Sequence, residues 1–446
     1  MVRNYFGTDG IRGKANQGVM TADTALRIGM AAGTFFTRGD YRHKVIVGKD
    51  TRLSGYLFET AITAGFLAAG MDVFLVGPMP TPAIAMLVKS MRADLGIMIS
   101  ASHNPYYDNG LKLFGPDGNK LSDNMEREIE GIMADNKLIK LASAEHIGKA
   151  TRIDDAAGRY IEFIKNSFPK GKTLDGFKIV VDCANGAAYH LGGKIFWELG
   201  AEVIELGVSP NGVNINLNCG SNHLESLSEA VIKHKACLGI ALDGDADRIQ
   251  MVDEQGNIID GDKILALIAC YLKKHNKLND NKIVATMMSN LAFEKYLNNQ
   301  GIDVIRTQVG DRYVAAKMNE FNLSLGGEQS GHIIVANYST TGDGLVAALQ
   351  MLALIQEQKQ PLSKVADIFT PLPQIIKNII PKNSLILEDA NIQEVIKAVE
   401  LKLGSKGRLL VRKSGTENLI RIMVEGEDIA LVNECLDMVA KALDNS

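Results

Sequence analysis

The stretch Ile97-Met-Ile-Ser-Ala-Ser-His-Asn-Pro105 decides how the rest of the chain is interpreted. Its first residues are apolar and predict a buried strand, and the small residues that follow form a loop presenting Ser102. In an open α/β sheet, ligands bind where the strands end at their carboxyl side. A serine at such a place is a nucleophile, a carrier of a phosphate group or a turn residue, and the remaining sequence must decide among the three.

The composition of the 446 residues excludes several classes of function. A hydrophobic content of 46% and a charged content of 22% are typical of a well-packed soluble protein, and the length predicts about two to four domains. A net charge of −4 without a basic block predicts no nucleic-acid partner. The apolar stretches are too short for a membrane span, so we expect no membrane contact. Five dispersed cysteines without CxxC spacing indicate reduced thiols in a cytoplasmic protein.

Three segments of the chain share the same order of sequence markers. Each starts with a β-branched strand, continues into a helix that ends near a glycine, and then shows a Leu-Gly pair. These pairs are Leu95-Gly96, Leu238-Gly239 and Leu325-Gly326, and a polar loop follows each of them. The recurrence predicts three copies of one βαβ-type unit, each delivering a different polar loop from the corresponding strand.

The repeat predicts a division into three similar α/β domains with a further domain at the end of the chain. We place the α/β domains at about residues 1–152, 153–258 and 259–368. The segment Thr370-Pro-Leu-Pro373 breaks both helix and strand and predicts a linker. Two strand patterns and two helix patterns beyond it predict a small α+β domain over residues 369–446.

The loop Asp243-Gly-Asp-Ala-Asp-Arg248 follows an apolar strand and places three carboxylates on alternate residues. Such clusters of oxygen ligands suit a hard divalent cation such as Mg²⁺. An EF-hand calcium loop fits poorly, because Arg248 stands where that loop requires glycine. Two interpretations remain open: Asp243 is an aspartate nucleophile of the haloacid-dehalogenase type, or Asp243, Asp245 and Asp247 are ligands of one metal ion.

Two further loops carry groups that suit a sugar phosphate. Gly326-Gly-Glu-Gln-Ser-Gly-His332 combines glycines with Glu328 and Ser330, whose oxygens can hydrogen-bond neighbouring sugar hydroxyls. Arg412-Lys-Ser-Gly-Thr-Glu-Asn-Leu-Ile-Arg421 sets two arginines around a Ser-Gly-Thr turn, and guanidinium, hydroxyl and turn N–H groups together bind anions well. A polar surface turn without a function is the alternative for each loop.

Two arginines and a lysine extend this set toward Ser102. Arg12 lies between glycines and Arg52 follows a buried strand; either adds positive charge near the serine or forms a structural ion pair. Lys112 begins the strand after the serine loop, where apolar neighbours predict a desolvated amine that serves as a general base. His103 is expected to be a poor base for Ser102, because neighbouring residues of an extended chain point in opposite directions. We expect it to have a structural or phosphate-orienting role.

Four of these loops, taken together, resemble the α-D-phosphohexomutase superfamily over essentially the whole chain. In family order they are Ala-Ser-His-Asn-Pro (101–105), Asp-Gly-Asp-Ala-Asp-Arg (243–248), Gly-Glu-Gln-Ser-Gly-His (327–332) and Arg-Lys-Ser-Gly-Thr-Glu (412–417). The stretch Phe6-Gly-Thr-Asp-Gly-Ile-Arg-Gly13, Gln329 and Val309-Gly-Asp-Arg-Tyr-Val314 look like the bacterial branch that acts on glucosamine phosphates. The branches that act on mannose or glucose phosphates are the alternative. Asn418 stands where the superfamily commonly has proline, which leaves that loop more mobile but keeps its anion-binding groups.

The resemblance implies three α/β domains with mixed sheets plus a C-terminal α+β domain, arranged around a central cleft. It implies an isomerase in which phosphoserine at Ser102 interconverts glucosamine 6-phosphate and glucosamine 1-phosphate through a 1,6-bisphosphate, which is also the priming phosphate donor. The resemblance also implies that the product is used to synthesise UDP-N-acetylglucosamine and cell-wall precursors. The implied cofactor is one Mg²⁺ ion per active site, and the implied partners are a hexosamine phosphate and a second copy of the chain.

The same resemblance assigns roles to residues of this sequence. The implied catalytic residues are Ser102, Lys112, His332 and Arg12, with Lys112 as the leading proton-transfer group and His332 as the second. The implied substrate-binding residues are Glu328, Ser330, Arg248, Arg412, Ser414, Gly415, Thr416 and Arg421. The implied metal ligands are Ser102, Asp243, Asp245 and Asp247.

Overall fold

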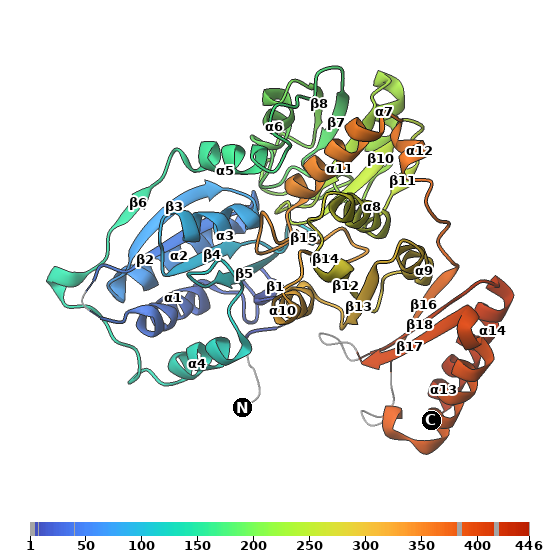
Figure 1. Ribbon diagram of the computed structural model, residues 1–446. Coiled ribbons are helices and arrows are strands. Elements are labelled where there is room, and N and C mark those ends of the chain that lie inside the picture. The colour runs from blue at the N-terminus through green and yellow to red at the C-terminus, as the bar shows by residue number, and fades with distance from the viewer. Residues whose placement is uncertain (1–4, 8, 40, 381–385, 414–418, 446) are drawn as a thin grey trace.

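Four sheets follow one another along the chain in the computed structural model, which describes residues 5–7, 9–39, 41–380, 386–413 and 419–445. In Figure 1 the first sheet lies at the left in blue, the second at the top in green, and the third between them and the C-terminal sheet. Three of the sheets are mixed, and the last is antiparallel in all its described pairings.

The first sheet has six strands in the order β1-β5-β4-β2-β3-β6. Its strands are β1 (Ile11–Lys14), β2 (Lys44–Lys49), β3 (Asp72–Pro78), β4 (Leu95–Ile99), β5 (Asp108–Phe114) and β6 (Ala150–Arg152). Its helices are α1 (Ala22–Phe36), α2 (Ser54–Ala68), α3 (Thr81–Ser90) and α4 (Asp123–Ala134). Successive side chains of a strand point to opposite faces, so Val45 and Val47 of β2 pack with α1 and α2, whereas Ile46 packs with α3.

The second and third sheets repeat this arrangement with shorter elements. The second has the order β11-β10-β9-β7-β8 and the third β13-β12-β14-β15. The strands are β7 (Lys178–Asp182), β8 (Glu202–Leu206), β9 (Leu238–Leu242), β10 (Ile249–Asp253), β11 (Ile258–Ile259), β12 (Lys282–Thr286), β13 (Asp303–Thr307), β14 (Leu325–Gly327) and β15 (Ile333–Val335). The helices beside them are α6 (Gly192–Glu198), α7 (Glu225–His234), α9 (Leu291–Asn299) and α10 (Asp311–Phe321).

The three sheets share one four-stranded core, as the sequence repeat predicts. In each, a central strand pairs in parallel with two neighbours, and the third strand pairs with an antiparallel fourth. The core orders are β3-β2-β4-β5, β8-β7-β9-β10 and β13-β12-β14-β15. The three polar loops therefore occupy the same topological position, the connection between the third and fourth core strands. The expectation of three similar α/β domains with mixed sheets is confirmed.

Two apolar helices join the second and third sheets into a continuous core. They are α8 (Gly261–Lys274) and α11 (Gly344–Gln358), which pack against each other and against β10. Residues 344–355 of α11 are buried throughout, which explains its apolar sequence without any membrane. Among the described helices, none is long and apolar enough to cross a bilayer. Helix α5 (Ala156–Lys165) ties this core to the first sheet through α3.

The C-terminal domain is a three-stranded sheet covered by two helices. Its strand order is β16-β18-β17, with β16 (Gln374–Ile379), β17 (Gly407–Lys413) and β18 (Ile420–Gly426). The helices are α13 (Ala390–Leu403) and α14 (Ile429–Asn445), which correspond to the two helix patterns expected beyond the linker. Strand β16, directly after the linker, is an addition to the two predicted strands. The remaining short elements are α12 (Leu362–Val365) and the 3₁₀ turns Ala144–His146, Asn279–Asn281, Ile386–Glu388 and Gly404–Lys406.

Candidate active site

The serine loop holds its hydroxyl against the acidic loop of the second sheet. Ser102 Oγ donates a hydrogen bond to Asp243 Oδ2 at 2.6 Å, and the serine is 2% exposed. Its backbone is in the left-handed region with φ +52°, a conformation that costs a non-glycine residue free energy. The Ser102 N–H compensates part of that cost by donating to Ser100 Oγ at 2.9 Å.

Arg52 holds the backbone of the serine loop through an ion pair and hydrogen bonds, instead of presenting a free positive charge to Ser102. Its buried guanidinium pairs with Asp50 at 2.8 Å and donates to the carbonyl oxygens of Ser102 and Asn104, each at 2.9 Å. Asn216 of the second domain donates to the Ser102 carbonyl oxygen at 2.9 Å as well. Of the two roles the sequence left open for Arg52, the structure therefore supports the structural ion pair.

The three alternate aspartates of the second loop form one buried cluster. Carboxylate oxygens of Asp243, Asp245 and Asp247 all lie within 4.8 Å of one another. Oδ1 of Asp245 and Oδ1 of Asp247 are buried without a hydrogen-bond partner. Burial, and after it the like charges of Asp247 and Asp245, raise the pKa of Asp243 well above its ordinary value. Three buried carboxylates this close together repel one another, and a divalent cation bound between them would neutralise that repulsion.

Lys112 is buried, as predicted, but among acids rather than apolar groups. Its ammonium donates to Asp245 Oδ2 at 2.8 Å and to Asp247 Oδ2 at 3.1 Å, and Asp9 lies 3.5 Å away. Burial would lower the pKa of Lys112, but the three carboxylates outweigh it and raise the pKa well above its ordinary value. The expectation of a lysine surrounded by apolar groups is therefore wrong, because the acids arrive from two other loops.

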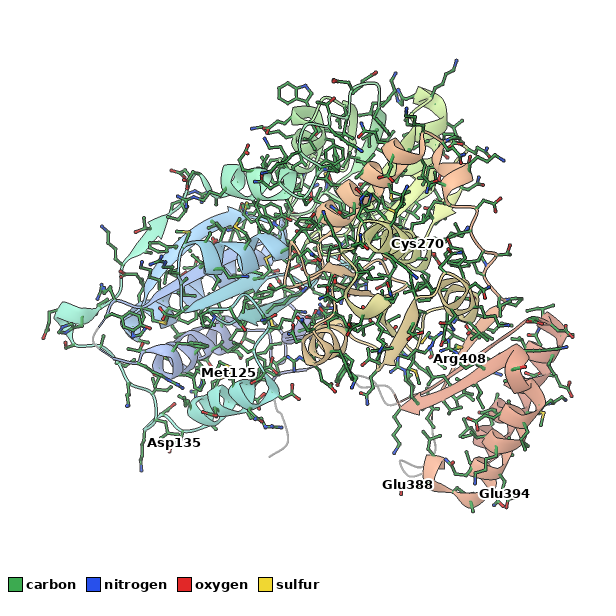
Figure 2. The ribbon with its side chains drawn as sticks, viewed as in Figure 1. Met125, Asp135, Cys270, Glu388, Glu394 and Arg408 are labelled. Atoms are coloured by element: carbon green, nitrogen blue, oxygen red, sulfur yellow. The ribbon has the colours of Figure 1, made fainter. Side chains whose placement is uncertain are left out.

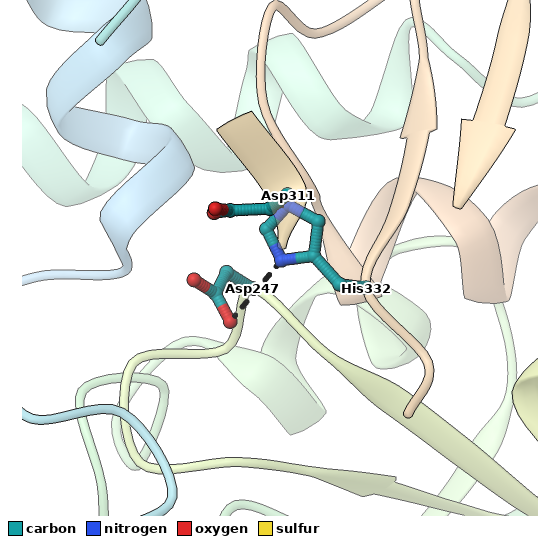
Figure 3. A group of neighbouring side chains, drawn as sticks. All are labelled: Asp247, Asp311 and His332. Atoms are coloured by element: carbon teal, nitrogen blue, oxygen red, sulfur yellow. Dashed lines mark ion pairs between the residues drawn. The ribbon is translucent and has the colours of Figure 1, made fainter. Parts of the chain in front are cut away.

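His332 lies between two carboxylates from different loops, as Figure 3 shows. Its Nδ1 is 3.6 Å from Asp247 Oδ1, and its Nε2 is 3.6 Å from Asp311 Oδ2. The Gly342 N–H donates to Nε2 at 3.1 Å. With this backbone donor at Nε2, the neutral ring would carry its proton on Nδ1, facing Asp247. Burial would lower the pKa of His332, but the charges of Asp247 and Asp311 outweigh it and raise the pKa, which favours the charged ring.

A cavity of about 590 Å³ brings the loops of all four domains together. The predicted site residues that line it are Arg12, Asp247, Arg248, Glu328, His332, Arg412 and Arg421. Ser102, Lys112, Asp243 and Asp245 are buried behind this surface. Glu328 is held by the Gly310 N–H, which donates to its Oε1 at 3.0 Å, and Ser330 Oγ lies 3.5 Å from its Oε2.

The C-terminal domain contributes a pair of arginines to the cavity. Arg412 of β17 and Arg421 of β18 are directly opposite each other in the antiparallel register, so their side chains share one face. Burial and the neighbouring Arg421 lower the pKa of Arg412. Two like charges held together in this way suit an anion between them. The predicted ligands Ser414, Gly415 and Thr416 lie outside the described residues.

The geometry also differs from one sequence expectation at His103. Because Ser102 has a positive φ, the two residues do not follow an extended chain, and His103 Nδ1 comes to 3.4 Å from Ser102 Oγ. Burial, followed by the charges of Arg248 and Arg12, lowers the pKa of His103 to about 3. The expectation that the two side chains point apart is therefore wrong.

Three charged residues beside the cavity were missed by sequence reasoning. Asp9 pairs with Arg12 at 2.8 Å, Asp311 approaches His332, and Lys120 forms ion pairs with both acids. Asp9 precedes Gly10 and Asp311 follows Gly310, each within a stretch that carried the family resemblance, which was the available signal. Lys120 lies in a polar turn that no local pattern distinguishes.

Fold and site together define an enzyme of the phosphohexomutase class. Four families match consecutive parts of the chain: phosphoglucomutase/phosphomannomutase alpha/beta/alpha domain I at residues 3–140, domain II at 158–256, domain III at 260–372, and the C-terminal domain at 376–442. The chain therefore belongs to the phosphoglucomutase/phosphomannomutase family, whose members are isomerases.

Individual relatives match over the whole length. The phosphoglucosamine mutase of Parvibaculum lavamentivorans is 56% identical over 446 residues and covers 100% of both chains. The phosphoglucosamine mutase of Paramagnetospirillum magneticum is also 56% identical over 446 residues, with 99% of each chain covered. The crystal structure of a phosphoglucomutase/phosphomannomutase family protein from Burkholderia thailandensis has a TM-score of 0.84 at 25% identity, covering 99% of this chain and 97% of that one.

Proposed function

We propose that the protein interconverts glucosamine 6-phosphate and glucosamine 1-phosphate through a phosphoserine at Ser102. The observation that carries this proposal is the 2.6 Å contact of Ser102 Oγ with Asp243, a member of a carboxylate cluster that also borders the cavity through Asp247. A serine nucleophile would need a strong base beside it, whereas a phosphate carrier needs a cation site and anion-binding groups. The relatives named phosphoglucosamine mutase support glucosamine phosphate as the substrate.

The carboxylate cluster would hold one Mg²⁺ ion, with Asp243, Asp245, Asp247 and the Ser102 oxygen as its ligands. The Oδ1 atoms of Asp245 and Asp247, which are buried without a hydrogen-bond partner, fit this assignment. When bound, the ion supplies positive charge beside the transferred phosphoryl group. Arg248, which lines the cavity next to the cluster, adds a fixed positive charge on the cavity side.

The proposed reaction moves one phosphoryl group in each of two steps. In the first, the phosphorus–oxygen bond to Ser102 breaks while the free hydroxyl of the substrate forms a new bond to phosphorus. The hydroxyl gives up its proton to a side chain, and the product is glucosamine 1,6-bisphosphate with Ser102 as a free hydroxyl after it takes up a proton. The bisphosphate reorients, and its other phosphoryl group is transferred to Ser102, whose hydroxyl gives up its proton. The sugar oxygen that is released takes up a proton, and the mutase product leaves. The same bisphosphate would prime an unphosphorylated chain.

Two side chains compete for the proton transfer. Lys112 was the leading candidate from the sequence, but its ammonium already donates to Asp245 and Asp247. His332 lines the cavity and carries a ring nitrogen toward each of two carboxylates. Alanine variants of each residue separate them: the proton carrier loses kcat by about 10²–10⁴-fold, the usual range for general acid–base catalysis.

The remaining predicted residues bind the substrate in this proposal. Glu328 and Ser330 hold sugar hydroxyls, while Arg412 and Arg421 hold the phosphate that is not reacting. Arg12 stays near the transferred phosphate, oriented by Asp9 at 2.8 Å. The sequence also predicts that Ser414, Gly415 and Thr416, which lie outside the described residues, belong to this anion site.

The test compares the parent protein with the Ser102→Ala variant. The parent is expected to carry one phosphoryl group by intact mass spectrometry and to have mutase activity, and the variant is expected to lack both. An active, unphosphorylated Ser102→Ala protein would contradict the proposal. The aspartate-nucleophile alternative instead predicts release of inorganic phosphate and activity that does not depend on Ser102.

A competition assay distinguishes the substrate from its relatives. We expect kcat/KM for glucosamine 1-phosphate to exceed the values for glucose 1-phosphate and mannose 1-phosphate, all measured with the same coupled method. A preference for either neutral sugar would identify the alternative branch of the family.

We also propose a cytoplasmic protein that forms a homodimer and binds neither nucleic acid nor membrane. All five cysteines are unpaired, which supports a reducing compartment. Leu53, Tyr56 and Leu57 are exposed at the start of α2 and offer an apolar surface for a second copy. Sedimentation velocity of the full chain measures this state directly.

A further inference from the structure

A segment of the first domain crosses to the third sheet beside the cavity. We call residues 115–126, between β5 and the first turns of α4, the strap. Thr340 Oγ1 donates to the Gly118 carbonyl oxygen at 2.6 Å, and Arg312 of α10 donates to Glu126 at 3.0 Å. The strap is therefore attached to the third domain at both of its ends, and Lys120 lies between these attachments.

Lys120 reaches acids that come from two different domains. Its ammonium forms ion pairs with Asp9, in the loop before β1, and with Asp311, the first residue of α10. Its side chain is 12% exposed. Burial would lower the pKa of Lys120, but Asp311 and Asp9 outweigh it and raise the pKa, so the side chain stays charged. The described residues that line the 590 Å³ cavity include both acids but not Lys120.

Each of these acids also contacts a side chain of the proposed machinery. Asp9 Oδ2 is 2.8 Å from Arg12 Nη2, and Asp311 Oδ2 is 3.6 Å from His332 Nε2. Lys120 is thus one residue removed from both Arg12 and His332. It connects a cation on one side of the cavity to the histidine on the other without lining the cavity itself.

Lys120 pairs with both carboxylates, while Asp9 also lies 2.8 Å from Arg12 and 3.5 Å from Lys112. Both acids pair with the same ammonium, so they lie close together across the domain boundary. Without the ammonium between them they would repel, and each would turn toward another cation. A buried ionic network that loses one member leaves an uncompensated charge, so its remaining groups rearrange. A displacement of about 1 Å at a reacting group can cost about 10²-fold in rate.

We propose that Lys120 is a positioning residue that holds Asp9 and Asp311, and through them Arg12 and His332, in their reactive arrangement. This inference rests on the mutase activity proposed above. A positioning role predicts a loss in kcat, because the catalytic groups are misaligned, and little change in KM, because Lys120 does not line the 590 Å³ cavity.

The test replaces the ammonium and measures the two kinetic constants separately. Lys120→Met is expected to lower kcat by about 10- to 100-fold, the range typical when an outer partner of a functional group is removed, with KM within about threefold of the parent. Lys120→Arg, which keeps the charge, is expected to recover most of kcat. If Lys120→Met does not fold, Lys120→Gln, which keeps most of the chain length and loses only the charge, takes its place.

A matched control separates positioning from simple attachment of the strap. Arg312→Gln removes a cation from the same domain boundary but leaves the Lys120 bridge to Asp9 and Asp311 in place. We expect it to lower the thermal melting temperature at least as much as Lys120→Met while kcat stays within about twofold of the parent. A Lys120→Met kcat within twofold of the parent, or an equal kcat loss in Arg312→Gln, would overturn the inference. An inactive parent would instead refute the proposed function and this inference with it.

Discussion

The boundary between the first and third domains and the boundary between the third and C-terminal domains are built differently. The first is a set of buried charge contacts beside the active site, with Lys120 between Asp9 and Asp311 and Arg312 against Glu126. Asp9 and Asp311, which Lys120 joins, also touch the candidate catalytic side chains Arg12 and His332. A change at this boundary that moves either acid would disturb the chemistry itself.

The C-terminal domain is attached mainly through one short segment, residues 288–290. Gln374 donates to the Met288 carbonyl oxygen at 3.2 Å, and Arg408 donates to the Ser289 carbonyl oxygen at 3.0 Å. Figure 2 labels Arg408 on the side of the C-terminal sheet that faces the third domain. Asn290 makes two hydrogen bonds with the backbone of Leu372 in the linker. Figure 1 shows the C-terminal sheet standing apart from the rest of the molecule beyond this point.

The difference indicates that two parts of the cavity have separate roles, the serine and carboxylate loops in phosphoryl transfer and the C-terminal arginines in binding. The serine and carboxylate loops are buried and held from several directions, as transfer of a phosphoryl group requires. The arginines of the C-terminal domain are positioned mainly through residues 288–290, with an exposed ion pair between Lys295 and Glu427 at 2.9 Å besides. We therefore expect changes in the serine and carboxylate loops to act on kcat, and changes in the C-terminal arginines to act on KM. Of the four predictions that follow, two measure these kinetic constants and two measure the attachment of the C-terminal domain.

The largest effect is expected from Asp245→Asn. Asp245 is buried with Oδ1 unpartnered, so the variant removes a proposed metal ligand with little change in volume. We expect kcat to fall by about 10³-fold, or about 4 kcal/mol, with a much smaller change in KM. Mg²⁺ should raise the melting temperature of the parent and not of the variant. A kcat within tenfold of the parent would contradict the cluster's assignment as the metal site.

A pH-dependent stability is expected at the attachment of the C-terminal domain. Asp262 of α8 accepts a hydrogen bond from the Asn290 N–H at 2.7 Å, and burial, followed by the charge of Asp260, raises the pKa of Asp262 to about 7. The folded protein therefore holds this proton more tightly than the unfolded chain. Its contribution to stability is complete below about pH 4 and is lost as the pH rises through about 7.

The size of this effect is about 1.4 kcal/mol for each unit by which the pKa is raised. Urea unfolding at pH 5 and pH 8 measures it, and the Asp262→Asn variant, which cannot ionise, should show a flatter dependence. Equal pH dependence in parent and variant would show that Asp262 titrates normally.

The Asn290→Ala variant tests the attachment directly. It removes both hydrogen bonds to Leu372 and the cap that Asn290 Oδ1 provides to the Ala292 N–H at 3.0 Å. We expect a destabilisation of about 2–3 kcal/mol and faster proteolysis in the linker. Asn290→Asp is the comparison variant: it keeps both acceptor bonds, replaces the donor to Leu372 with a carboxylate oxygen and adds a negative charge. Linker proteolysis at the parent rate in Asn290→Ala would argue against residues 288–290 as the attachment.

The smallest effect is expected from Arg421→Gln in the C-terminal half. Because Arg421 would bind the phosphate that does not react, its loss should raise KM by about tenfold and change kcat by less than about threefold. Arg421→Lys should recover only part of the affinity, since an ammonium lacks the two-pronged geometry of guanidinium. A fall in kcat with unchanged KM would break the contrast between the two halves.

Much of the fold was predictable because its signals are local. A β-branched strand, a glycine at a helix end and a Leu-Gly pair recur at short range, and their order alone predicted three equivalent units. The strand β16 was missed because the prolines before it dominate that part of the sequence. The positions of Ser102 and of the three aspartates at strand ends followed from the same local patterns.

Side-chain environments were predicted less well because they depend on contacts between loops. Lys112 has apolar neighbours in the sequence, yet its ammonium meets acids of two other loops. His103 approaches Ser102 because of one positive φ that the sequence does not announce. Lys120 carries no local signal, and its importance appears only when Asp9 and Asp311 are seen on either side of it.

By itself, the sequence determined the repeated units, the polar loops at their strand ends and the family, because each is written in residues close together along the chain. Only the tertiary structure decided which acids surround Lys112, that Arg52 holds the backbone of the serine loop, and how the four domains are attached. Electrostatic energies depend on distance in space rather than along the chain, and burial strengthens them. The chemistry of Ser102 therefore depends on Asp243, which is 141 residues away in the sequence but accepts a hydrogen bond from the serine in the fold.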